Sequence, residues 1–311
     1  MTRALLAVAL LALTGASAGA SATPAGAPTI AGCPVFPASS VWNQPVDKLP
    51  VARDSATIIA TIGLDSPVHA DFGSGLWNGS KIGIPYVVVS GKTTPKSHVS
   101  FEYADESDKG PYPIPANVPI EGDPNPGNGD RHAIIIDRDT CTLYELYALH
   151  RQGSGWAAGS GAIWDLRSNT LRPATWTSAD AAGLPILPGL ARYDEVAAGA
   201  IDHALRFTAP DTRRAFIYPA RHDASDSNDP SLPPMGLRVR LKAGVDISSL
   251  PPQARVVAQA LKTYGMILAD NGSPWYISGA PDPRWSNDQL HALDRLTGAD
   301  FEVVDTSHLR P

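Results

Sequence analysis

The chain has 311 residues, of which 43% are hydrophobic and 18% are charged, and its formal net charge is −6. Acidic and basic residues are mixed along the sequence, so it has neither a basic tract for nucleic acid nor a cationic amphipathic helix for membranes. We therefore expect no nucleic-acid partner. The apolar content suffices for a sizeable core, and we expect a monomer.

The first 22 residues have the pattern of a secretory signal peptide. Arg3 precedes the apolar run Ala4–Leu13, and small residues follow up to Ala22. A membrane-spanning helix needs about twenty apolar residues, and this run is too short, as is every later apolar run. We expect a signal peptide over residues 1–22 and a single secreted β-rich domain over residues 23–311, without a membrane span.

Two cysteines, Cys33 and Cys141, are the only ones in the chain. The segment TIAGC at residues 29–33 resembles a lipoprotein processing box, which would anchor a lipid at Cys33, but a proline-containing stretch separates it from the apolar run. In an oxidising compartment the two thiols are natural partners for each other. We predict a disulfide that closes a loop of about a hundred residues and contributes roughly 4 kcal/mol.

Short apolar runs separated by glycines and prolines are typical of many strands joined by loops. We predict a mainly β fold, either an antiparallel β-sandwich or a bent sheet, with a few peripheral helices. Helices are expected at residues 54–63, 251–265 and 286–296. Strands are expected at residues 84–90, 98–103, 132–147, 161–166, 200–208, 215–219, 236–242, 266–278 and 301–305, with hairpins in 132–147 and at Asn271-Gly272, and with the basic side of 236–242 in solvent.

A long proline-rich connection, residues 105–130, contains no predicted element. Connections of this length in compact domains are usually disordered or functional. We interpret it as a wall of a binding cleft, with a plain surface loop as the alternative.

The hairpin over residues 132–147 carries polar side chains on a face that is otherwise apolar. A turn centred on residues 138 and 139 would place His132 opposite Glu145, with Asp130 diagonal to that glutamate. A carboxylate beside a histidine at a cleft edge can act as a general acid or base, and Asp130 could complete a glycosidase-like carboxylate pair. The alternative is a buried bond between His132 and Glu145 that only fixes the strand register.

Two further residues are candidates for the catalytic group. Asp180 lies in an apolar segment rich in glycine and proline, where its other interpretation is an N-cap for the short turn that follows. His203 would lie on an apolar strand face, where it could instead be a hydrogen-bonded core residue. The sequence contains no zinc-ligand pattern, nucleophile elbow, phosphate loop or dinucleotide fingerprint, and we expect neither a metal nor a cofactor.

Three aromatic residues are candidates for sugar platforms, namely Trp77, Tyr147 and Trp156. Flat rings with polar neighbours suit ligands that present both CH surfaces and hydroxyl groups. Ordinary loop packing is the alternative for each ring.

Four runs, CPVFPASSVWNQPV, GDRHAIIIDRDTCTLYELY, WTSADAAGLPILPGL and YGMILADNGSPWYISGAPDPRW, resemble in that order a group of uncharacterised exported bacterial proteins. They are spread over residues 33–285 of the chain. The resemblance implies a single folding unit and a secreted protein. It transfers no activity and no catalytic residue.

The sequence therefore supports three hypotheses. The first is a secreted glycoside hydrolase or polysaccharide lyase acting on an extracellular polysaccharide. The second is a non-catalytic glycan-binding or cell-envelope module. The third is a cell-wall peptidase or amidase that uses His132 or His203.

Overall fold

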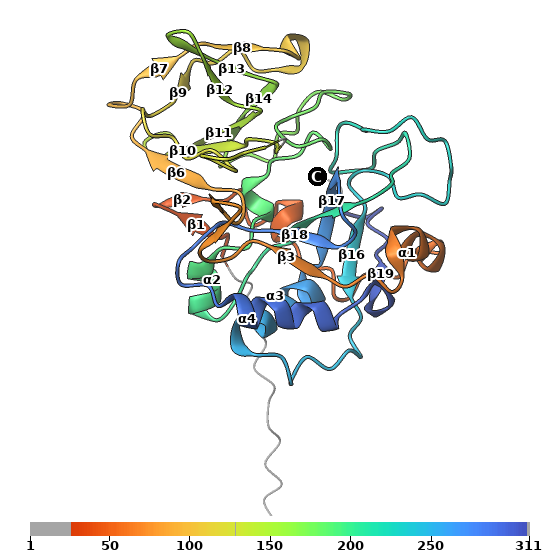
Figure 1. Cartoon of the computed structure of the whole chain (residues 1–311). Coiled ribbons are helices and arrows are strands. Elements are labelled where there is room, and N and C mark those ends of the chain that lie inside the picture. Colours follow the sequence, from red (N-terminus) through yellow and green to blue (C-terminus); the bar gives the residue numbers. More distant parts are fainter. Residues whose placement is uncertain (1–25, 128, 310–311) are drawn as a thin grey trace, which may run out of the picture.

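The computed structural model of the protein describes residues 26–127 and 129–309, so the predicted signal peptide lies outside the described residues. Strands outnumber helical elements and form several sheets, which confirms the predicted mainly β fold with peripheral helices. Within the described residues, no helix has both the length and the apolar character to cross a membrane. Figure 1 shows two sheet-containing halves, with strands β6–β14 at one end and β15–β19 at the other.

The first half is built on a four-stranded sheet with the order β14-β11-β10-β6, in which β10 runs antiparallel to β11 and parallel to β6. A three-stranded sheet, β12-β13-β8, and small two-stranded sheets accompany it. The strands of this half and of the N-terminal segment are β1 (Thr29–Ile30), β2 (Cys33–Pro34), β4 (Leu76–Trp77), β5 (Ser80–Lys81), β6 (Tyr86–Val89), β7 (Lys96–Ser97), β8 (Val99–Phe101), β9 (Tyr112–Pro113), β10 (Ala133–Asp137), β11 (Thr142–Tyr147), β12 (His150–Gln152), β13 (Gly155–Ala158) and β14 (Ser160–Asp165).

The predicted hairpin between β10 and β11 is present, but the predicted register is wrong. Ile134 pairs with Glu145, which moves His132 away from that glutamate by two positions along the partner strand. The turn is later in the chain than expected because the Asp137 side chain accepts hydrogen bonds from Asp139 N and Thr140 Oγ1. A shift of two residues keeps every side chain on its predicted face, so the faces remain as predicted while the facing pairs change.

Both faces of the four-stranded sheet are buried. Ile134, Ile136 and Leu143 belong to one apolar cluster, whereas Ile135 and Leu146 belong to another. The alternating pattern of a half-exposed sheet is therefore absent here, as expected for a sheet covered on both sides.

The predicted disulfide is present and links Cys33 in β2 to Cys141 in the turn before β11. It ties the N-terminal segment to the edge of the four-stranded sheet. The Cys33 sulfur is thereby bonded to another sulfur rather than to a lipid.

The second half is a six-stranded mixed sheet with the order β19-β16-β17-β15-β18-β3. Its strands are β3 (His69–Asp71), β15 (Leu205–Ala209), β16 (Arg238–Leu241), β17 (Met266–Asn271), β18 (Tyr276–Ser278) and β19 (Phe301–Val303). The expected hairpin at Asn271-Gly272 is wrong, because β15 lies between β17 and β18. The backbone N–H groups of Gly272 and Trp275 donate to carbonyls of β15, so the turn binds to that strand instead of closing a hairpin.

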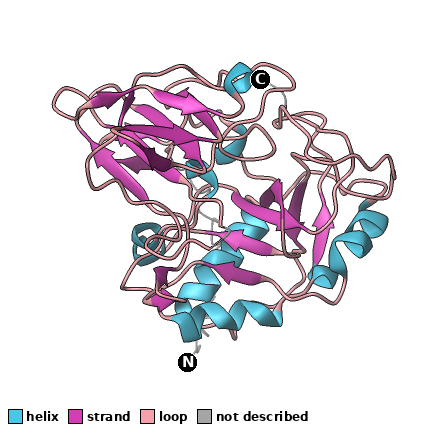
Figure 2. Cartoon of the chain, turned by 45° about the horizontal axis from the view of Figure 1, so that its top comes forward, coloured by secondary structure: helices cyan, strands magenta, loops and turns pink. Residues whose placement is uncertain are grey.

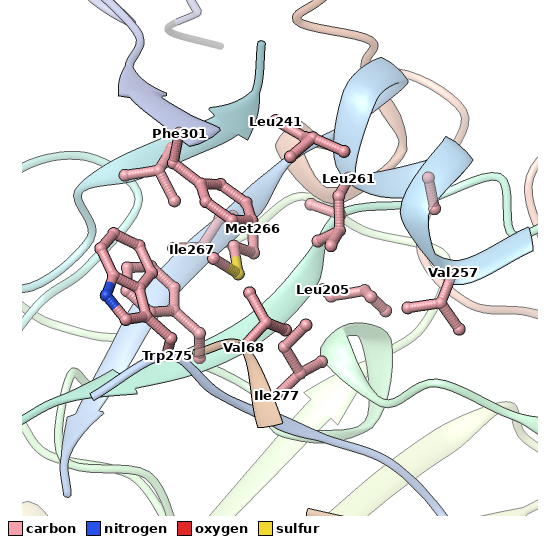
Figure 3. Close-up of a cluster of buried hydrophobic side chains, with 14 of the residues drawn as sticks. Val68, Leu205, Leu241, Val257, Leu261, Met266, Ile267, Trp275, Ile277 and Phe301 are labelled. Atoms are coloured by element: carbon pink, nitrogen blue, oxygen red, sulfur yellow. The ribbon is translucent and has the colours of Figure 1, made fainter. Parts of the chain in front are cut away.

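Helices cover the second half, as Figure 2 shows. The helices are α1 (Ser55–Gly63), α2 (Tyr193–Ala198), α3 (Pro252–Thr263) and α4 (Asn287–Leu290), with short 3-10 turns at Val41–Asn43, Ala104–Glu106, Leu187–Gly189, His291–Arg295 and Gly298–Asp300. Three of the four helices match predicted segments. Figure 3 shows α3 placing Val257 and Leu261 against the sheet residues Leu205 and Met266, the apolar stripe expected from a period of 3.6 residues.

Two local expectations for the second half do not hold in full. The basic side of residues 236–242 is solvated only at Lys242, since Arg238 is buried and donates to the backbone carbonyls of Val41, Gln44 and Tyr264. Residues 215–219 form only an isolated bridge at Phe216. Both segments pack against neighbours that the local sequence does not reveal.

Candidate functional site

A cavity of ≈420 Å³ lies where the ends of several strands meet. Tyr147 ends β11, Ser160 begins β14, and Asp270 lies near the end of β17. The remaining lining comes from loops and short turns of both halves. It comprises Tyr103, Glu106, Asp130, Thr177, Ser178, Ala179, Asp180, Ala181, His222 and Ala224.

Three of the predicted site residues, Asp130, Tyr147 and Asp180, line this cavity together. Glu106 and Asp130 are at the two ends of the proline-rich connection 105–130, so both ends of that segment contribute to the wall. Asp130 is exposed, and it precedes β10.

Asp270 is the carboxylate whose protonation is most relevant to chemistry in the cavity. Its side chain is 24% exposed, and Oδ2 lies 3.4 Å from Nη2 of Arg206. Desolvation raises the pKa of Asp270 to about 7, and the negative charges of Asp180 and Asp130 act in the same direction against the attraction of Arg206. Near neutral pH this group can therefore both hold and release a proton.

Asp180 and Arg206 form a buried ion pair beside Asp270. Oδ1 and Oδ2 of Asp180 lie 2.8 and 2.9 Å from Nη2 and Nε of Arg206, and both side chains are buried. A short turn follows Asp180, but its carboxylate accepts hydrogen bonds from Arg206 rather than from backbone N–H groups of that turn, so the N-cap interpretation does not describe it. Its carboxylate is occupied by the guanidinium, which suits a residue that positions the site.

His132 lies behind the wall and does not contact Glu145. Its Nδ1 is 2.6 Å from Glu121 Oε2, and its Nε2 is 3.0 Å from the carbonyl oxygen of Ala179. Both partners accept hydrogen bonds, so both ring nitrogens carry protons. Burial alone lowers the pKa of His132, but the carboxylate of Glu121 outweighs burial and raises it to about 9. At neutral pH the ring is an imidazolium that holds two loops together.

Glu145 is fully buried and does not line the cavity. Its carboxylate accepts hydrogen bonds from the backbone N–H groups of Ile186 and Leu187 at 2.9 to 3.0 Å. Burial raises the pKa of Glu145 to about 7, and these two N–H groups oppose the shift. Because Glu145 is outside the cavity lining, its contacts indicate that it supports the 186–187 turn.

His203 and Trp156 also lie away from the cavity. His203 is buried, with Nε2 3.1 Å from Glu195 Oε2 and Nδ1 2.9 Å from the carbonyl oxygen of Ala204, as in a hydrogen-bonded core histidine. Trp156 is only 7% exposed, and the guanidinium of Arg151 covers its ring at 3.7 Å. Trp77 is 72% exposed and lines a second cavity.

Four contributors to the cavity region were missed at the sequence level, namely Asp270, Arg206, His222 and Tyr103. Asp270 follows the apolar run MILA, and a charged residue at the end of a buried strand is a usable signal for a site at the sheet edge. His222 places Nδ1 2.8 Å from the carbonyl oxygen of Ala181, which implies a proton on that nitrogen. Nothing near His222 or Tyr103 in the sequence indicates their place in the cavity.

The residues described by the structure contain no cluster of three or more His, Cys, Asp or Glu side chains that could hold a metal ion. Comparison of the chain with protein-family models, with curated proteins and with solved structures gave no match.

Proposed function

We propose that the protein is a secreted glycoside hydrolase that cleaves a neutral polysaccharide in the ≈420 Å³ cavity, with Asp270 as general acid and Asp130 as the second carboxylate. The observation that carries the proposal is the meeting, in one cavity, of two carboxylates in different surroundings. Hydrolysis of a glycosidic bond needs one protonated and one ionised carboxyl group.

The surroundings of the two groups divide these roles. Asp270 is largely buried and lies beside the ion pair of Asp180 and Arg206, and its pKa is raised to about 7. Asp130 is exposed. In this mechanism Asp270 donates its proton to the departing glycosidic oxygen, and the Asp130 carboxylate either activates a water molecule or attacks the anomeric carbon.

The charge of the cavity favours a hydrolase over a polysaccharide lyase. Glu106, Asp130 and Asp270 line it, whereas the described lining contains no lysine or arginine. The nearby cation Arg206 is already paired with Asp180. Lyases cleave uronates and must neutralise the carboxylate of the substrate, which this negative lining would instead repel.

Two tyrosines, Tyr103 and Tyr147, supply the flat surfaces that a sugar ring requires. Tyr103 is 47% exposed at the edge of the cavity. Tyr147 lies deeper, with its ring centroid 5.9 Å from that of His132.

The test is release of reducing ends from a panel of soluble neutral polysaccharides. Asp270→Asn is expected to lower the rate by roughly a hundredfold or more, the usual contribution of a general acid, and to remain folded by circular dichroism. Asp226→Asn changes an exposed acid outside the cavity lining and should keep the full rate.

Other outcomes would overturn the proposal in distinguishable ways. Products that absorb in the ultraviolet would identify a lyase, and polysaccharide binding without cleavage would identify a glycan-binding module. Release of new amines from peptidoglycan would identify a peptidase or amidase.

A further inference from the structure

A second cavity, of ≈400 Å³, is separate from the proposed active site and has Asp71 in its lining. Trp77 lines it and is 72% exposed. The rings of His69 and Tyr276 line it as well, with centroids 4.4 Å apart. A cavity lined by an exposed tryptophan and two further flat rings suits a ligand that presents both CH surfaces and hydroxyl groups.

The hairpin that carries Trp77 is attached to the same loop that supports the first cavity. Ser80, the partner of Trp77 across β4 and β5, donates a hydrogen bond to the carbonyl oxygen of Gly122. The preceding residue, Glu121, pairs with His132, whose ring also binds Ala179 in the wall of the first cavity. Trp77 is therefore positioned by the framework of the proposed active site.

Beneath the surface, one polar row on the six-stranded sheet lies between the two cavities, and its middle members, Ser278 and Arg206, are buried. Asp71 lines the second cavity and lies opposite Ser278, the hydroxyl of which accepts a hydrogen bond from Arg206. Arg206 in turn contacts Asp270 in the first cavity. These side chains share one face, on strands β3, β18, β15 and β17.

The separation suits a chain rather than a single sugar. Neighbouring strands lie about 4.8 Å apart, so three strand spacings separate the strands of Asp71 and Asp270 by roughly 14 Å. A ligand that fills both cavities must extend over several sugar rings.

We infer that the second cavity is a distal subsite, an inference that rests on the proposed function. In this subsite Trp77 stacks on one sugar ring of a neutral polysaccharide. The polysaccharide chain then continues across Asp71 into the cavity that contains Asp270. The enzyme would then cut within long chains, because binding energy gained at Trp77 is available only to substrates that reach it. The negative charge of Asp71 disfavours anionic chains at this subsite too.

The experiment measures kcat/KM on labelled neutral oligosaccharides of increasing length, with Trp77→Ala compared with Leu76→Ala. Leu76 is the adjacent exposed residue of the same strand, points to the opposite face, and does not line the cavity. Trp77→Ala is expected to lower kcat/KM by about tenfold on long chains, from lost stacking, and to leave the shortest substrates unchanged. Leu76→Ala should match the wild type at every length.

Equal behaviour of the two variants at all lengths would overturn the distal subsite while leaving hydrolysis intact. If the protein cleaves no glycan, the subsite is tested separately by gel retardation in undigested neutral polysaccharides. Retardation that is lost with Trp77→Ala and kept with Leu76→Ala would support the subsite without the activity. Absence of retardation for the wild-type protein in every gel would overturn it.

Discussion

Asp180, which lines the same cavity as Asp270, is joined to the buried Arg206 by two hydrogen bonds. Two opposite charges without solvent stabilise each other only as long as both are present. The pair therefore ties the stability of the protein to the electrostatics of the proposed acid.

Asp180→Asn should destabilise the protein by about 3 kcal/mol, because the buried guanidinium loses its closest carboxylate and keeps only the partly exposed Asp270, at 3.4 Å. Urea unfolding measures this change. The matched control is Asp194→Asn, which removes one partner of the exposed ion pair with Arg284 and should cost less than about 1 kcal/mol. Equal losses for the two variants would show that the buried ion pair contributes no more to the free energy of unfolding than the exposed one.

The ion pair between His132 and Glu121 predicts a pH dependence of stability. The folded pKa of His132 is about 9, above the value of roughly 6.5 in an unfolded chain. A raised pKa stabilises the fold fully below pH ~6.5, and this contribution is lost as the pH rises through about 9, with a total of about 3 kcal/mol. Glu121→Gln should flatten this slope, whereas His150→Gln, a change at an exposed histidine, should not. Identical slopes in all three proteins would contradict the pairing.

Glu145→Gln separates a structural role from a catalytic one. The amide oxygen can accept from Ile186 and Leu187 as Oε1 does, but the amide NH2 would then face the N–H of Ile186, donor against donor, and we expect a loss of about 1 to 3 kcal/mol in stability. Activity per folded molecule should persist, because Glu145 lies outside the cavity. The exposed Glu102→Gln serves as the control for both measurements. Loss of activity with unchanged stability would restore Glu145 as the acid or base.

The sequence predicted the elements of this fold better than it predicted their partners. The stripe of Val257 and Leu261 and the apolar runs around Ile135 identify a helix and a strand from local periodicity alone. The pairing of Leu268 with Phe207 could not be predicted locally, because β15 enters between β17 and β18 from about sixty residues earlier in the chain.

The candidate site was predicted only in part, because local patterns identify residues but do not identify their partners from distant segments. Asp130, Tyr147 and Asp180 were identified because polar groups beside apolar runs need an explanation. The assignment of His132 to Glu145 failed on a register shift of two residues, which the Asp137 side chain imposes on the turn. The true partner of His132 is in the proline-rich connection, where no periodicity indicates a contact.

The disulfide between Cys33 and Cys141 is expected to contribute to stability through the unfolded state. It spans a sequence separation of 108 residues, and a loop of this size corresponds to about 5 kcal/mol in the chain-entropy model. Cys33→Ser/Cys141→Ser should therefore lower the melting temperature. A reductant should lower the melting temperature of the wild-type protein to the same value and leave the double variant unchanged. A double variant that melts like the oxidised wild type would contradict this contribution.

The pH dependence of kcat/KM on a neutral polysaccharide tests Asp270 as the general acid. Since its pKa is about 7 in the folded protein, the protonated form is lost above that pH, and kcat/KM should fall by about tenfold per pH unit there. The charge of Asp180 is one cause of the raised pKa of Asp270, and Asp180→Asn removes it. In this variant, measured below its melting temperature, the alkaline limb of the profile, which is the fall of kcat/KM at high pH, should therefore begin at lower pH. Asp226→Asn changes an exposed charge outside the cavity lining and should leave the limb in place. A limb that stays unchanged in Asp180→Asn would mean that another group supplies the proton.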